Sequence, residues 1–143
     1  RAVVNTELGY GDSIAQEYIL KARTTNTTTT ELTTDGATGS GTTNRVQIPT
    51  NSACLVELLF SVKQDSSPNC AKYKKELLIV NDGGTVALNG SVQNVGTDIP
   101  TVPPITITAA ANNTNDCLRV EVNGISATNL NWTCLVRMTI RRY

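Results

Sequence analysis

The segment ACLVELLFSVKQ, residues 53–64, alternates apolar and polar side chains. Its odd positions include Glu57, Ser61 and Lys63. A period of two residues is typical of a β-strand with one face turned inward, because successive side chains of a strand point to opposite faces. The segment therefore predicts a long, half-buried strand. Its apolar even positions are Cys54, Val56, Leu58, Phe60 and Val62.

The same alternation returns elsewhere in the chain. Between Leu130 and Ile140 the even positions are apolar, and Leu118, Val120 and Val122 alternate with polar residues before Gly124. Turn signals rich in Asn, Asp and Gly separate these segments. About eight short strands at this spacing predict an all-β, antiparallel β-sandwich, jelly-roll-like, without a convincing helix. Shorter strands are predicted at Ile14–Ala22, Arg45–Ile48, Tyr73–Val80, Thr85–Leu88 and Ile105–Ala109.

Three stretches are predicted as connections. The Thr-rich run from Thr24 to Thr30 fits an exposed strand or a linker, and the Gly- and Ser-rich run from Asp35 to Thr43 fits a flexible loop. Residues 96–104 contain Pro100, Pro103 and Pro104. Proline cannot donate to a sheet ladder, so this stretch is expected to be an extended connection outside any central strand.

Composition limits the function. The 143 residues fit a single domain, 1–143, and 39% of them are apolar. Twelve basic and twelve acidic residues cancel, which argues against nucleic acid as a partner. No apolar run is long enough to cross a bilayer, so no membrane partner is expected. The absence of histidine removes the commonest general base and metal ligand, so we expect neither an enzyme nor a cofactor.

Three segments together resemble the C-terminal module of bacteriophage tail-fibre and tailspike proteins. They are GDSIAQEYIL at residues 11–20, with the Thr-rich run and ELTTDG after it; NRVQIP at residues 44–49, leading into the long strand; and LRVEVNG at residues 118–124, followed by NWT at 131–133 and a closing strand. They span nearly the whole chain. Family members usually carry an acidic residue near the end of that strand, where this chain has Arg141-Arg142-Tyr143.

The resemblance implies a β-sandwich in a homotrimeric virion fibre that is assembled in the host cytoplasm and recognises a host surface polysaccharide. Other fibre, tail or capsid proteins are then expected partners. Because the chain starts at Arg1, we expect the C-terminal fragment of a longer fibre protein. Two alternatives stay open. One is a capsid decoration protein or trimerisation cap without a receptor, and the other is a glycan-cleaving enzyme.

The four cysteines have no CxxC spacing, and no histidine completes a mixed site, so zinc is not expected. Cys54 and Cys134 fall on the inward parity of their strands and fit small buried residues. Cys70 and Cys117 flank turns, and a disulfide between them is one hypothesis. Free thiols are the alternative, because virion proteins assemble in a reducing cytosol.

Receptor contact is predicted for exposed aromatic and turn residues. Trp132 has the inward parity of its strand, so Tyr73, beside three lysines, is the preferred exposed aromatic, with a core or trimer-interface position as the alternative. The turn residues Asn81, Asp82, Asn112, Asn113 and Asn115 are candidates for hydrogen bonds to sugar hydroxyls. Aspartates that would form a catalytic pair all sit in turn sequences, where they have a structural role.

Overall fold

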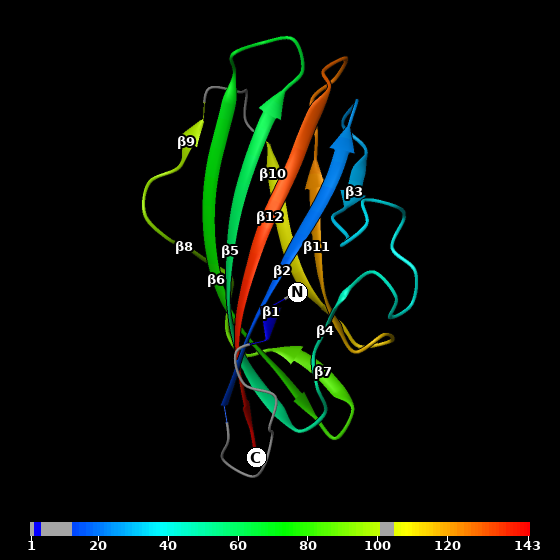
Figure 1. The fold of residues 1–143 in the computed structure, drawn as a ribbon, viewed down its shortest axis with the longest axis vertical. Helices are drawn as coiled ribbons and strands as arrows, with labels where there is room; N and C mark the ends of the chain where they lie inside the picture. The colour runs from blue at the N-terminus through cyan, green and yellow to red at the C-terminus, as the bar shows by residue number, and fades with distance from the viewer. Residues whose placement is uncertain (1, 4–12, 101–104) are drawn as a thin grey trace.

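Four strands of twelve or thirteen residues dominate the computed structural model, which describes residues 2–3, 13–100 and 105–143 (Figure 1). Each carries the two-residue alternation. They are β2 (Ser13–Thr24), β5 (Ser52–Gln64), β6 (Cys70–Asp82) and β12 (Leu130–Arg142).

Eight shorter strands complete the described chain. They are β1 (Ala2–Val3), β3 (Thr29–Glu31), β4 (Val46–Gln47), β7 (Thr85–Leu88), β8 (Gln93–Asn94), β9 (Ile99–Pro100), β10 (Thr106–Asn112) and β11 (Cys117–Asn123). Within the described ranges the chain forms no helix, and hence none long and apolar enough to span a membrane.

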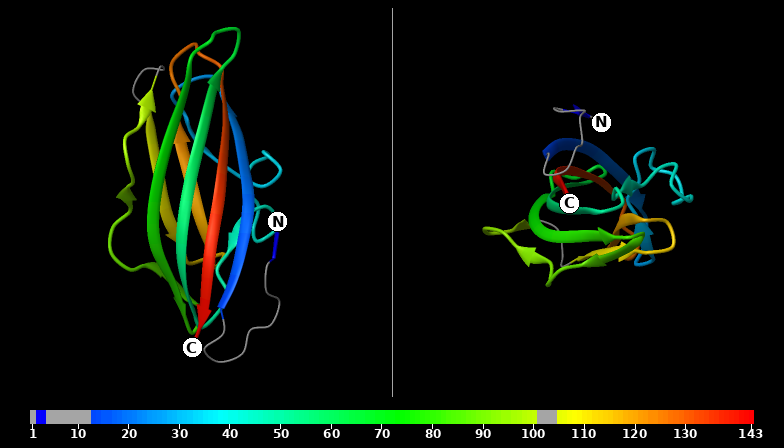
Figure 2. Two further views of the ribbon diagram at one scale, coloured as in Figure 1. Left: turned by 60° about the vertical axis from the view of Figure 1, so that its left-hand side comes forward. Right: turned by 90° about the horizontal axis from the view of Figure 1, so that it is seen from below.

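The strands form two antiparallel sheets. The eight-stranded sheet has the order β1-β2-β12-β5-β6-β7, with β8 and β9 also on β6, and the four-stranded sheet has β10-β11-β3, with β4 also on β11. The four long strands lie side by side as one curved sheet (Figure 2). The smaller sheet lies against the inner face of this sheet. The observed all-β, antiparallel arrangement is consistent with the predicted sandwich.

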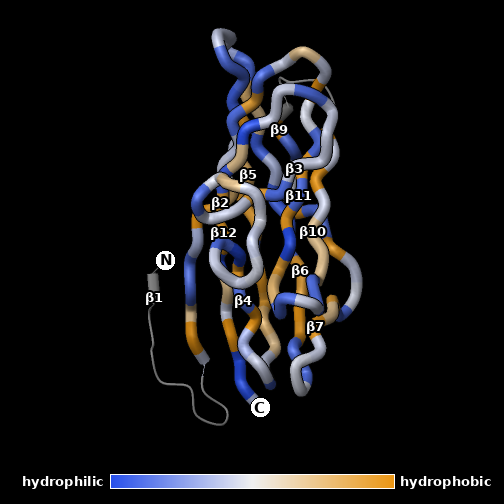
Figure 3. Tube along the Cα trace, turned by 90° about the vertical axis from the view of Figure 1, so that its right-hand side faces the viewer, coloured by the Kyte–Doolittle hydropathy of each residue, from blue (hydrophilic) through white to orange (hydrophobic). Residues whose placement is uncertain are grey.

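The core fills the space between the two sheets. Phe60 of β5 and Trp132 of β12 are fully buried in one hydrophobic cluster with Val120 and Val122 of β11. Residues of the same parity are buried along the whole of β5 and β12. Figure 3 shows hydrophobic and hydrophilic residues following one another along the strands. Cys54 and Cys134 are buried among them, which confirms their predicted position.

At one corner of the sandwich, the end of β2 is in close contact with the segment that follows β11. Thr24 ends β2, and its buried hydroxyl accepts a hydrogen bond of 2.9 Å from Trp132 Nε1. Gly124 follows β11 and lies against this hydroxyl, so that a Cβ there would also come within 2.5 Å of the backbone oxygen of Asn26. The indole is therefore both packed and satisfied in its hydrogen bonding, as a buried Trp requires.

The sequence predicts the long strands well and the short ones less well. Thr85–Leu88 is observed as predicted, and Tyr73–Val80 extends to the whole of β6. The Thr-rich run divides into the end of β2, a turn and β3. β9 contains Pro100 and pairs only with β6, which agrees with proline at a sheet edge. Pro103 and Pro104 lie outside the described residues.

We expect Gly124→Ala to destabilise the protein because the new methyl group displaces the Thr24 hydroxyl and the backbone at Asn26. Overpacking of this kind costs about 1–3 kcal/mol of the free energy of unfolding. Urea denaturation measures the loss. Ser126→Ala, an exposed site in the same connection, is the matched control and should leave the midpoint unchanged. Equal midpoints for Gly124→Ala and wild type would contradict the proposed corner.

Candidate functional site

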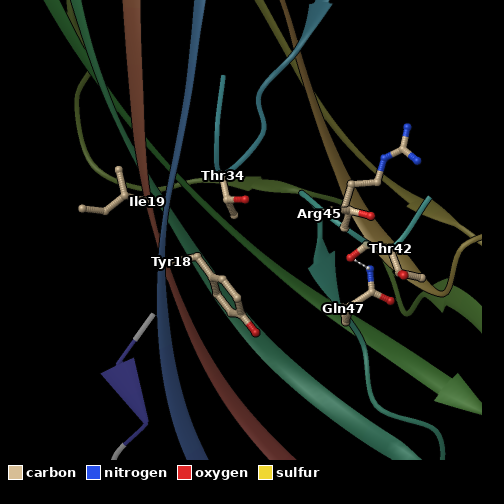
Figure 4. Close-up of a pocket in the computed structure, with 7 residues that line it drawn as sticks. Tyr18, Ile19, Thr34, Thr42, Arg45 and Gln47 are labelled. Atoms are coloured by element: carbon tan, nitrogen blue, oxygen red, sulfur yellow. Dashed lines mark hydrogen bonds between the residues drawn. The ribbon is translucent and has the colours of Figure 1, made fainter. Parts of the chain in front are cut away.

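A polar hollow of about 520 Å³ opens beside β2, where the larger sheet meets the loop that leads into β4. The volume lies in the range of small-molecule sites. Its rim is made of threonine, glutamine and tyrosine side chains, and Figure 4 shows them converging from two segments far apart in the sequence. The lining residues are Tyr18, Ile19, Thr34, Thr42, Thr43, Arg45 and Gln47.

Tyr18 supplies the aromatic wall of the hollow. It has the inward parity of β2 but is only partly buried, and the described part of β1 pairs with β2 at Gln16 and Glu17. Its hydroxyl donates to Gln16 Oε1 over 2.7 Å. Figure 4 shows Tyr18 and Ile19 pointing to opposite sides of the strand. The half-buried ring is thereby held in one orientation with part of its surface open.

The opposite wall is a loop arranged around one buried amide. Asn44 is 4% exposed, and its Nδ2 donates to Asp35 Oδ1 and to the carbonyl of Thr38. Its Oδ1 accepts from Ser40 N–H over 2.9 Å. Composition predicts a flexible loop over residues 35–43. The structure instead shows these residues hydrogen-bonded to a buried side chain.

Arg45, which also lines the hollow, stabilises the same loop through its guanidinium. Its Nε and Nη2 donate to the two carboxylate oxygens of Glu31 at 2.8 and 2.9 Å, and its Nη1 donates to the carbonyl of Gly41. The hydrogen bond to Glu31 raises the pKa of the guanidinium. Gly39 packs so closely on this pair that a Cβ would come within 2.5 Å of Arg45 Nη2. In Figure 4 the guanidinium points away from Tyr18.

Asp35 begins the loop as a hydrogen-bond acceptor. Its Oδ1 accepts from the backbone N–H of Ala37 at 2.9 Å and from Asn44 Nδ2 at 2.9 Å. These bonds favour the ionised carboxylate, so the pKa of Asp35 lies below its usual value, with the Ala37 bond as the largest cause. The carboxylate is thus a structural element of the loop.

The hollow offers hydrogen bonding without net charge. Thr34, Thr42 and Thr43 are exposed residues that carry hydroxyl groups. Gln47 Nε2 donates only one long hydrogen bond, of 3.4 Å, to the carbonyl of Thr42. The one cation of the lining is already paired with Glu31. No group of three or more potential metal ligands is found among the described residues. The arrangement can bind a neutral polar molecule and shows no nucleophile–base pair.

The prediction of Tyr73 as an exposed aromatic is wrong. Tyr73 is 9% exposed and belongs to the hydrophobic core, and burial raises the pKa of its hydroxyl. Its inward-facing neighbours on β6 include Ala71 and Leu77, whereas Lys72 and Lys74 have the opposite parity. The adjacent lysines suggested exposure in the sequence, but alternation turns the tyrosine between them inward.

The predicted turn residues are structural elements of two hairpins. Asn81 is fully buried, donating to the carbonyl of Ile48 and accepting from Gly84 N–H, so it cannot contact a receptor. Asn113 Oδ1 accepts from Val86 N–H over 2.7 Å and so connects β7 to the β10–β11 turn. Asn112 Oδ1 accepts from the backbone N–H groups of Thr114 and Asn115. Asp82 and Asn113 are exposed, Asn112 and Asn115 are partly buried, and receptor contact by these four residues stays a prediction.

The suggested Cys70–Cys117 disulfide is not formed. Cys70 is exposed and pairs with Lys63 in the larger sheet, whereas Cys117 is buried and pairs with Asn112 and Gln47 in the smaller one. Figure 1 places the β5–β6 hairpin and the β10–β11 hairpin at different ends of the molecule. Flanking a turn does not bring two residues together when the turns belong to different sheets.

Sequence reasoning missed the residues that line the hollow. Thr42, Thr43 and Gln47 come from a loop and a two-residue strand whose sequence is compositionally ordinary. Only Tyr18 carried a signal, as an aromatic in an edge strand next to a polar residue.

Comparisons with known proteins give only a weak structural similarity. No family model matches the chain, and no curated protein matches it. A similar solved structure is the crystal structure of the Acinetobacter baumannii phage AM24 tailspike protein, with a TM-score of 0.43 and 11% sequence identity. The match covers 90% of this chain and 26% of that chain, so this chain spans about a quarter of the tailspike.

We expect Arg45→Lys to loosen the loop, because lysine keeps the charge but cannot reach both Glu31 oxygens. The free energy of opening the loop should fall by about 1–2 kcal/mol. This change should appear as faster amide hydrogen exchange at residues 38–44. Arg137→Lys is the matched control, since its pair with Glu17, at 2.9 Å, is exposed. Pairs of that kind contribute about 0–1 kcal/mol. Similar effects of the two substitutions would contradict a bracing role for Arg45.

Thiol reactivity separates Cys70 from the other cysteines. Burial makes the Cys54, Cys117 and Cys134 thiols inaccessible to reagents. Burial also raises their pKa, which favours the unreactive protonated thiol. In the folded protein we expect a chromogenic disulfide reagent to modify Cys70 only, and in denaturant all four cysteines. If the denatured protein showed only two reactive thiols until it was reduced, the result would support the Cys70–Cys117 disulfide.

Proposed function

We propose that this chain is a non-catalytic, saccharide-binding module of a phage fibre or spike, presented as a homotrimer on the virion. The observation that carries the binding role is the hollow beside β2. It combines a fixed aromatic ring with exposed hydroxyl and amide groups on a hydrogen-bonded loop. The phage context comes from the resemblance of the three sequence segments.

The chemistry of the hollow favours a neutral sugar. A saccharide offers hydroxyl groups to hydrogen-bond donors and acceptors, and its C–H face packs on an aromatic ring. The three threonine hydroxyls and the Gln47 amide provide both donors and acceptors. Because Arg45 is held by Glu31, the lining adds no uncompensated positive charge that would select an acidic sugar.

The carboxylates of β3 and β11, which line a separate hollow, support binding without catalysis. Glu31 and Glu121 are directly opposite each other on neighbouring strands. Glycosidases use two neighbouring carboxylates, so this pair is the one to consider for catalysis. Each already has an arginine partner, Arg45 for Glu31 and Arg119 for Glu121. Both carboxylates are thus already engaged in ion pairs, which supports a structural role for them.

Three copies of a shallow polar site would compensate for weak binding at each. Linking sites raises the effective concentration of the second and third binding events, so that avidity exceeds the affinity of one site. A homotrimer therefore suits this hollow. Light scattering on the isolated chain at micromolar concentration measures its oligomeric state.

A capsid decoration protein or trimerisation cap is the second candidate. It is favoured by the apolar side chains on the outer face of the larger sheet, among them Ile19 and Leu55, which a purely receptor-binding monomer would not need. Such a protein would assemble but would bind no saccharide.

We expect Tyr18→Ala to weaken binding to bacterial surface polysaccharides by at least about tenfold, which corresponds to about 1.4 kcal/mol. Tyr18→Phe keeps the ring and should retain binding, because the hydroxyl is already used by Gln16. A polysaccharide array identifies a ligand, and titration calorimetry with its oligosaccharide measures the affinity of each variant.

Tyr143→Ala is the matched control, since Tyr143 is a second exposed aromatic, 51% exposed, at the end of β12. Thermal unfolding of each variant separates lost binding from lost folding. Binding that survives Tyr18→Ala in a folded protein, or binding that falls with Tyr143→Ala instead, would assign the saccharide to another surface.

A further inference from the structure

The outer face of the four long strands carries large apolar side chains in register. Ile19 of β2, Leu135 of β12 and Leu59 of β5 are directly opposite one another across adjacent strands. In a second row, Thr139 of β12 stands opposite Leu55 of β5, and Leu55 opposite Leu78 of β6. We call Ile19, Leu135, Leu59, Leu55 and Leu78 the outer patch.

The outer patch is unusually exposed for apolar residues. Ile19 is 60% exposed, Leu55 54%, Leu59 39% and Leu78 37%. Only two other large apolar side chains of the described residues, Ile99 and Tyr143, are exposed. Single exposed leucines are ordinary, but several gathered on one sheet face mark an interaction surface. The solvent face of an antiparallel sheet is otherwise expected to be polar.

This face carries charges of both signs, and several of them form ion pairs. The row between the two apolar rows contains Glu17, Arg137, Glu57 and Glu76 in register. Arg137 pairs with Glu17 at 2.9 Å, and Lys74 of the neighbouring row pairs with Glu57 at 3.1 Å. A partner that itself carries both signs of charge can complement this face. A second copy of this chain, with zero net charge and the same paired row, meets that condition.

The two margins of the face differ in shape. At the β6 margin a hollow of about 440 Å³ is lined by Leu55, Leu77 and Leu78 and bordered by residues 89–93. At the β2 margin Ile19 projects from the strand (Figure 4). A projecting apolar side chain and an apolar hollow on opposite margins fit a head-to-tail contact, in which the two partners use different surfaces. Head-to-tail contacts close into rings when the rotation between copies allows it.

We propose that the outer patch is the interface between copies of this chain, with Ile19 of one copy seated in the hollow beside Leu55 and Leu78 of the next in a cyclic trimer. The four strands span about 40 Å by about 19 Å, or roughly 800 Å². Specific interfaces bury about 800 Å² per partner, so the face is large enough to carry the assembly. This inference rests on the homotrimer of the proposed function, and Ile19 is the one residue that the outer patch shares with the lining of the saccharide hollow.

The first test measures the mass of the full chain by light scattering across micromolar concentrations. The wild type should be trimeric, and Leu55→Asp and Ile19→Asp should each be mainly monomeric, with association at least tenfold weaker. Thr114→Asp introduces the same carboxylate at an exposed position in the β10–β11 turn of the smaller sheet, away from the outer face, and should remain trimeric. Circular dichroism and thermal unfolding establish that each variant is folded.

Cross-linking tests the head-to-tail geometry directly. In a Cys70→Ser background, chains carrying Ile19→Cys are mixed with chains carrying Leu78→Cys and exposed to mild oxidant. A disulfide between the two kinds of chain, rather than between identical chains, supports the proposal. Cross-linking of Ile19→Cys with itself indicates a two-fold contact and overturns it. A monomeric or dimeric wild type, or a folded Leu55→Asp trimer, overturns it as well.

Saccharide binding separates this inference from the proposed function. Monomeric Leu55→Asp should bind oligosaccharide with the wild-type affinity per site, because Leu55 does not line the hollow beside β2. A wild-type trimer that dissociates as predicted but binds no saccharide supports the interface and contradicts the receptor-binding role.

Discussion

The buried inner face of the four long strands is the constraint on which the rest of the structure depends. Every second residue of β5 and β12 is withdrawn from solvent, and Trp132 and Phe60 are the largest fully buried side chains of the described residues. A shift of one residue in the pairing of either strand would exchange the buried and exposed sets, so the core fixes the register of the whole sheet. The positions of Tyr18 and of the outer patch follow from that register.

The polar hollow depends on a different kind of interaction. The loop before β4 has almost no apolar side chains, and it is ordered by the buried Asn44 amide and the Arg45–Glu31 pair. A buried amide without partners would be costly, which ties the loop to one arrangement. The rigid inner face thus carries an edge site whose second wall is shaped by hydrogen bonds.

The two faces of the larger sheet have separate roles in this interpretation. The inner face and its edge hold the core and the saccharide hollow, whereas the outer face presents the outer patch to other copies of the chain. Because Tyr18 and Ile19 are adjacent on β2, one strand contributes to both. Assembly and saccharide binding therefore occur close together without sharing the surface of Leu55 and Leu78.

The sequence by itself determined the strand character of the long segments and the burial of Cys54, Cys134 and Trp132, because alternation is a local property of the strand. It did not determine which segments become neighbours. β12 lies between β2 and β5, although more than a hundred residues separate Trp132 from its partner Ala22. Only that pairing brings the apolar outer residues of three strands together as the outer patch.

The hollow was beyond sequence reasoning for the same reason. Thr42 and Gln47 have no local signal, and their meeting with Tyr18 depends on where the loop crosses from one sheet to the other. For Tyr73, in contrast, the local signal was present, because the tyrosine alternates with Lys72 and Lys74 in the sequence. The cluster of lysines nevertheless suggested that the tyrosine is exposed. Parity within a strand is set by the backbone, whereas the composition of a surface site is set by packing between distant segments.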